Sequence, residues 1–241
     1  MRNIGNGMPA PEAPATIPWP HSEEGTIPSL PEQLAGRIGD RILAGEFEPG
    51  ARIIEQNLAQ EYGVSRGPIR DAFRILERER LLTNNPRRGV TVTLLTQKDL
   101  AEVFEINSAL LGIVGRKLAE ARSKEAVQLL NRAIEEVRAW ATNPNVAGIL
   151  AAVGYRLTID LVQLAGNARM VRIVANQSLE SYRYRLLAFQ SEVHRKKTLA
   201  RWRALQRAIK QGNVSAAVEW WTLVIAATRN ELLGKVPDSP K

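Results

Sequence analysis

The stretch Tyr62 to Phe73, YGVSRGPIRDAF, constrains the fold more than any other part of this sequence. Gly63 supplies the left-handed residue that ends helices, and Ser65 can cap a new helix. Pro68 then falls in the first helical turn, where its missing N–H has no intrahelical partner. The pattern predicts one helix over Glu55 to Tyr62 and a second helix after a tight turn. Two helices joined in this way form a helix-turn-helix.

The second helix of this pair is predicted to have one buried and one exposed face. Apolar side chains recur at helical spacing and indicate a core-facing stripe, which consists of Ile69, Ala72, Phe73 and Leu76. The opposite face carries Arg66, Gly67 and Arg70. Because Gly67 has no side chain, the helix N-terminus can approach a phosphate or a base edge closely, and its free N–H groups favour an anion.

The flanking segments complete the pattern of a winged helix. Leu34, Ile38 and Ile42 recur at helical spacing before the sequence GEFEPG ends a first helix. After Leu82 the pattern changes to alternation, and the turn NNPRRG predicts a two-stranded wing. Exposed arginines are most often only solvated. A capped helix, a Gly-Pro opening, paired arginines and a basic wing in this order nevertheless favour a nucleic-acid partner.

Residues 58–92, LAQEYGVSRGPIRDAFRILERERLLTNNPRRGVTV, resemble the winged helix of GntR-type bacterial transcription regulators, and the resemblance covers residues 30–95. It implies binding of a double-stranded DNA operator by a homodimer. Arg66 and Arg70 are the expected base readers, since a bidentate guanidinium on guanine contributes about 1–3 kcal/mol of discrimination. The positions that the resemblance assigns to operator contact are Gln56, Ser65, Arg66, Gly67, Arg70, Arg88 and Gly89.

The remainder of the chain reads as helical from Thr96, with breaks at 142–145, 166–167 and 212–213. It resembles the all-helical FCD-type sensor domain of the FadR subgroup, in the sequences LAGN and AIKQGN. The expected fold is mainly α: an N-terminal winged helix-turn-helix with a small β wing, and a C-terminal antiparallel helical bundle of about six helices. The expected domains are a disordered Pro-rich tail over 1–29, the winged helix over 30–95 and the helical domain over 96–235.

Many members of that subgroup hold a divalent metal through an aspartate and three histidines. The resemblance places at those positions four residues that cannot coordinate, Ala152, Arg156, Trp202 and Val224. We therefore expect no metal and no cofactor. The arginine and glutamate that are usual on the first helix of the bundle are here Asn107 and Leu111.

The same comparison suggests a candidate effector site without a metal. Arg156 is expected to bind a small acidic metabolite in place of the metal, with Trp202 as an apolar wall. In the alternative interpretation, Arg156 pairs with a bundle acid such as Asp160 and Trp202 fills the space.

The net charge of +8 suits an anionic partner, but it is unevenly distributed. The excess lies in residues 183–210, where Glu192 is the only acid. A solvated helix face is the favoured interpretation, and attraction to an anionic effector or to flanking DNA is the alternative. His194 is expected to be solvated within VHRKK. The absence of cysteine, of a signal peptide pattern and of an apolar run of spanning length predicts a cytoplasmic protein with no membrane partner.

An enzyme is the rival class of function. The sequence contains no phosphate-cradling Gly-Lys loop, no nucleophile elbow and no cluster of metal-ligating residues. We therefore expect no catalytic activity and no catalytic residue. Another alternative is a regulator whose helical domain only dimerises or binds a protein partner.

Overall fold

The computed structural model describes residues 27–85, 89–140 and 146–238, and within these ranges the chain is mainly helical. The N-terminal part consists of α1 (Leu30–Leu43), α2 (Glu55–Tyr62), α3 (Arg66–Arg78), β1 (Leu82–Asn85) and β2 (Gly89–Val92). This confirms the predicted winged helix. The expected tail up to residue 26 and the wing-tip arginines Arg87 and Arg88 lie outside the described residues.

The wing is an antiparallel hairpin in which Leu82 pairs with Val92 and Asn85 pairs with Gly89. The segment before α2 adds a short third edge, because Arg52 forms a bridge with Thr91 and Ile53 N donates to the Val90 carbonyl at 2.9 Å. Antiparallel pairing therefore extends from the wing back to the loop after α1.

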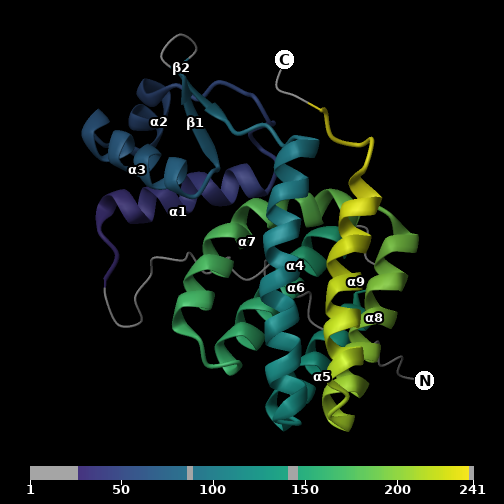
Figure 1. The fold of residues 1–241 in the computed structure, drawn as a ribbon. Helices are drawn as coiled ribbons and strands as arrows, with labels where there is room; N and C mark the ends of the chain where they lie inside the picture. The colour runs from purple at the N-terminus through teal and green to yellow at the C-terminus, as the bar shows by residue number, and fades with distance from the viewer. Residues whose placement is uncertain (1–26, 86–88, 141–145, 239–241) are drawn as a thin grey trace, which may run out of the picture.

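The C-terminal part is a bundle of helices that pack against one another. Its helices are α4 (Gln97–Glu120), α5 (Lys124–Ala139), α6 (Val146–Leu164), α7 (Ala168–Ala188), α8 (Glu192–Gln211) and α9 (Val214–Leu232). Figure 1 shows α4 and α9 side by side along the bundle, and these two helices pack closely. The structure confirms the predicted mainly α fold.

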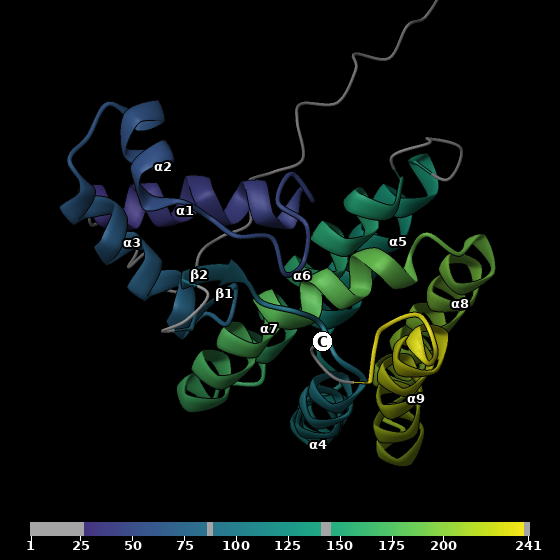
Figure 2. The ribbon, with the colours of Figure 1, turned by 90° about the horizontal axis from the view of Figure 1, so that it is seen from above.

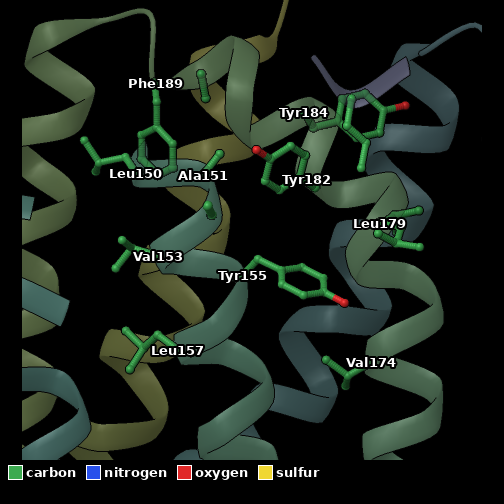
Figure 3. Close-up of a cluster of buried hydrophobic side chains, with 14 of the residues drawn as sticks. Leu150, Ala151, Val153, Tyr155, Leu157, Val174, Leu179, Tyr182, Tyr184 and Phe189 are labelled. Atoms are coloured by element: carbon green, nitrogen blue, oxygen red, sulfur yellow. The ribbon is translucent and has the colours of Figure 1, made fainter. Parts of the chain in front are cut away.

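The core of the bundle is built around α6 and α7 (Figure 3). Tyr155 of α6 meets Tyr182 of α7 edge to face, with ring centroids 6.4 Å apart. Leu150 and Leu161 of α6 and Leu179 of α7 are fully buried. Edge-to-face aromatic pairs add stabilisation beyond the area that they bury, so the two helices have a well-defined register.

Hydrophobicity makes α6 unusual among the described helices. It is long and apolar enough to cross a membrane by length and composition, with a mean hydropathy of 1.3. The expectation that no apolar run reaches spanning length is therefore wrong for this helix. However, 67% of the apolar window is buried inside the protein, which is the arrangement of a core helix.

The winged helix lies to one side of the bundle, beside α7 (Figure 2). Arg183 of α7 donates from Nη1 to the Thr93 carbonyl at 2.8 Å, and the Tyr184 hydroxyl donates to the Thr96 carbonyl at 3.0 Å. At the other side of the connection, Gln97 N donates to the Pro237 carbonyl at 2.9 Å. The segment that joins the wing to α4 is thus held by α7 and by the residues after α9.

Candidate nucleic-acid interface and helical-domain cavity

The N-terminus of α3 lies on the surface of the winged helix. Gly63 ends α2 in the left-handed conformation, with φ 65°, and Pro68 lies in the first turn of α3, both as predicted. Ser65 occupies the N-cap position, but its side chain makes no capping hydrogen bond, so the prediction holds for the position only. The predicted apolar stripe is buried and packs α3 on α1; it consists of Ile69, Ala72, Phe73 and Leu76.

The exposed face of α3 gathers the polar side chains that the sequence predicts to contact DNA. Arg66 donates from Nη2 to Gln56 Oε1 at 3.1 Å, and Arg70 forms an ion pair with Glu55, with 3.1 Å between Nη2 and Oε1. The Arg70 side chain is 61% exposed. Exposed pairs of this kind contribute only about 0–1 kcal/mol, so either guanidinium can exchange its partner for a phosphate or a base at low cost.

Gly67 is not required by the fold. It lies in the first turn of α3, and an added Cβ would meet only Ser65 Oγ, at 4.0 Å. Space is therefore open above the helix N-terminus, on the same face as Arg66 and Arg70. This geometry is consistent with a close approach of another molecule to the backbone at this point.

The wing adds a cation that sequence analysis missed. Gly89 begins β2 with φ 76°, and an added Cβ there would lie 3.5 Å from Arg52 Nε. The guanidinium of Arg52 therefore lies beside Gly89, at the end of the hairpin nearest its turn. Its position depends on the bridge to Thr91, which joins residues far apart in the sequence, and neither periodicity nor a local motif signals that contact.

The helical domain contains a cavity between α4, α6, α7, α8 and α9. Its volume, measured as the space open to the centre of a water molecule, is about 60 Å³. Large apolar side chains form most of the wall, namely Phe104, Leu111, Leu157, Phe189, Trp202, Trp221, Val224 and Ile225. Polar side chains interrupt it at Asn107, Thr158, Ser181, Arg185, Thr198 and Thr228.

Arg185 of α7 is the cation of this cavity. Its Nη2 donates to Ser181 Oγ at 3.1 Å, and its Nη1 lies 3.5 Å from Thr158 Oγ1. An added Cβ at Gly154 would lie 3.9 Å from Arg185 Nη1 and 3.6 Å from the Trp202 ring, so the glycine leaves room for both side chains. Burial lowers the pKa of Arg185 to about 10, so the guanidinium is still charged at neutral pH.

The structure places the two predicted effector residues differently. Trp202 lines the cavity, as does Val224, but Arg156 does not. Its Nη2 lies 2.6 Å from Glu136 Oε1 on the outside of α6, so Arg156 pairs with a bundle acid as in the alternative interpretation, although that acid is Glu136 of α5 and not Asp160. The α6 residues that share the cavity with Trp202 are Gly154, Leu157 and Thr158, and Gly154 and Thr158 each lie two residues after the positions expected from sequence. Two residues turn a helix by about 200°, which explains why Ala152 and Arg156 miss the cavity.

The basic segment of residues 183–210 is not simply a solvated face. Arg183 binds the Thr93 carbonyl, Arg185 lines the cavity, and Arg195 donates from Nη1 to the Phe189 carbonyl at 2.7 Å. The favoured interpretation is therefore wrong for these three arginines. It holds for Lys196, whose exposed ammonium pairs with Glu192 at 2.6 Å.

His194 is buried, contrary to the expectation of a solvated side chain. It is 2% exposed, and its ring lies 5.5 Å from that of Phe189, with Nε2 3.5 Å from Thr228 Oγ1. Burial lowers the pKa of His194 to about 4, so the imidazole is neutral at neutral pH. Within the described part of the chain, no three His, Cys, Asp or Glu side chains gather in a group that could hold a metal ion.

Comparison with known proteins gives two family matches. Residues 30–92 match the gntR family of bacterial regulatory proteins, and residues 102–233 match the FCD domain. An HTH-type transcriptional regulator of Bacillus subtilis, YdhC, is 28% identical over 77% of this chain and 83% of its own length. The gluconate operon transcriptional repressor of Bacillus licheniformis is 34% identical, over 44% of this chain and 43% of its own.

Solved structures share the fold. A GntR transcriptional regulator from Rhodococcus sp. RHA1 superposes with a TM-score of 0.72 at 22% identity, covering 85% of this chain and 97% of that one. Escherichia coli McbR/YncC gives a TM-score of 0.72 at 16% identity, over 87% and 99% of the two chains.

Proposed function

This chain belongs to the GntR family of bacterial regulatory proteins and carries an FCD domain, and we propose that it binds a pseudo-palindromic DNA operator as a homodimer in the cytoplasm. The observation that carries the proposal is the exposed face at the start of α3. Gln56, Ser65, Arg66, Gly67 and Arg70 all lie at the surface there. Arg88 and Gly89 of the wing are proposed to contact the adjacent DNA backbone.

The chemistry of this face suits a duplex. A helix N-terminus with exposed N–H groups attracts a phosphate, and guanidinium groups bind guanine or phosphate in a bidentate manner. One such face per chain reads one half-site, so a two-fold dimer requires a site with two-fold symmetry.

The experiment that tests this proposal is selection of bound duplexes from a random pool by the purified full chain. We expect enrichment of a sequence with two inverted half-sites whose centres are about one helical turn apart. Binding should fall steeply with salt, and ultracentrifugation should give a dimer. Failure to enrich any sequence at low salt would contradict the proposal.

The helical domain is proposed to respond to a small acidic effector, as in the FadR subgroup, and to do so without a metal. The cavity beside Trp202 supports this role, because it combines apolar walls with a few convergent polar groups. The joint formed by Arg183, Tyr184 and the segment before α4 lies next to it on α7. Occupation of the cavity can thereby influence the winged helix.

A further inference from the structure

Arg185 carries a charge that the described side chains do not neutralise. Its hydrogen-bond partners are two hydroxyl groups, those of Thr158 and Ser181, and none of the ion pairs in the described part of the chain involves it. Asp and Glu side chains form the usual partners of a buried guanidinium, because a charge removed from water costs several kcal/mol unless it is paired. The cavity wall therefore has the electrostatics of an anion site.

Two other residues of the same wall each have a buried polar atom with no hydrogen-bond partner among the described residues. Asn107 Oδ1 of α4 is a buried acceptor, and Trp221 Nε1 of α9 is a buried donor. The two residues are only 5% and 6% exposed. Buried polar groups in folded proteins are hydrogen-bonded in the large majority of cases, and each exception calls for an explanation. A ligand that supplies both a donor and an acceptor explains both atoms together.

The volume of the cavity and the charge on its wall limit which ligands it can hold. A volume of about 60 Å³ corresponds to roughly four water positions, which limits the ligand to a few carbon atoms. With a single guanidinium on the wall, a second carboxylate would be buried without a cation. An ammonium group would lie close to Arg185 without a described acid to balance it. Both outcomes carry the cost of an unpaired buried charge.

We propose that this cavity binds a short-chain hydroxy acid with one carboxylate, held by Arg185 together with Asn107 and Trp221. Arg185 binds the carboxylate through a charge-assisted hydrogen bond. Asn107 Oδ1 accepts from the hydroxyl group, and Trp221 Nε1 donates to an oxygen of the ligand. Trp202 and Phe104 contact the carbon chain. The inference rests on the proposed function, because it takes the cavity as the effector site. Arg185 takes the role of carboxylate partner that the sequence suggested for Arg156.

The test is a calorimetric titration of the full chain with sodium salts at millimolar concentration, in buffer freed of divalent metals. The hydroxy monoacids are glycolate, lactate and 3-hydroxybutyrate. Three further compounds serve as controls: propionate lacks the hydroxyl group, succinate has a second carboxylate, and propanediol, which is added as the neutral compound, has no carboxylate. At least one hydroxy monoacid should bind about tenfold more tightly than each of the other three compounds. Binding of none of the hydroxy acids, equal binding of propionate or succinate, or binding that requires an added metal would overturn the proposal.

Two variants test the residue assignment. Arg185→Met should weaken binding of the best hydroxy acid at least tenfold, whereas Arg156→Met, which removes the same charge from the outer face of α6, should leave it unchanged. Asn107→Leu should remove the preference for the hydroxy acid over propionate. Thermal melts establish whether each variant is folded. If Arg185→Met does not fold, Arg185→Lys, which retains the charge, takes its place. Equal affinity of the Arg185 and Arg156 variants would overturn the assignment.

The same proteins separate this inference from the proposed function. Arg185→Met should bind the selected duplex as the unmodified chain does, because Arg185 lies in the helical domain. If the unmodified chain binds the duplex but no hydroxy acid, only the ligand assignment fails. If it binds a hydroxy acid but no duplex, the proposed function fails and the ligand site stands.

Discussion

Gly67→Ala should have opposite effects on stability and on DNA binding. Gly67 has no atom closer than 4.0 Å to an added Cβ, and it lies in the first turn of α3. An alanine there adds helix propensity and restricts the unfolded chain, which stabilises the protein by about 0.5 kcal/mol. For a chain of this size, the melting temperature should rise by about 1–2 °C.

The added methyl group should weaken operator binding, because it occupies the open space through which a phosphate would reach the helix N-terminus. We expect a loss of about tenfold in affinity, equivalent to about 1.4 kcal/mol, for the duplex selected by the unmodified chain. Fluorescence anisotropy at fixed salt measures the affinity, and circular dichroism measures the melting temperature.

Gly148→Ala provides the matched control. Gly148 lies in the first turn of α6, and an added Cβ there also meets no atom within 4 Å. It should stabilise the protein similarly and leave DNA affinity unchanged. Unchanged operator affinity in Gly67→Ala, or an equal loss in both variants, would refute the argument that Gly67 permits a close approach to DNA.

Three further predictions concern the helical domain. Tyr184→Phe removes the hydrogen bond to the Thr96 carbonyl and should lower the free energy of unfolding by about 1 kcal/mol, as measured in urea. Burial lowers the pKa of His194 to about 4, below its unfolded value, so stability is lost as the pH falls. The unmodified chain should lose about 2 kcal/mol between pH 7 and pH 5 through this group, and His194→Gln should not show that loss. Treatment with a chelator should leave the melting temperature unchanged; a lower value, or stoichiometric zinc, nickel or manganese by elemental analysis, would contradict a metal-free domain.

Helix α3 could be predicted from sequence because its determinants are local. Gly63 and Pro68 act on the backbone of their own turn, and the stripe from Ile69 to Leu76 follows the helical period. The wing was predictable for the same reason. The contact of Arg52 with the wing depends on a bridge between distant segments, and no local pattern encodes it.

The cavity could be placed in the right domain but not assembled residue by residue. Trp202 lines it, whereas on α6 Gly154 and Thr158 line it in place of Ala152 and Arg156, which lie two residues earlier. On a helix, a shift of two residues moves a side chain to the opposite face, so Arg156 lies outside the cavity and its guanidinium pairs with Glu136. From the sequence alone, Arg185 and His194 are only members of a basic segment. Their burial depends on packing against α6 and α9, which the composition of their own segment does not reveal.

The central claim, that the start of α3 reads DNA, is tested most directly by comparing the selected duplex with a random duplex. The unmodified chain should discriminate between the two, and Arg66→Ala and Arg70→Ala should each reduce that discrimination by about 1–3 kcal/mol. Arg138→Ala is the control, because Arg138 is an exposed arginine of α5 that pairs with Glu135. Arg138→Ala should lower the affinity for either duplex only slightly and leave the discrimination between them intact. Full discrimination in the protein that lacks both Arg66 and Arg70 would contradict the account.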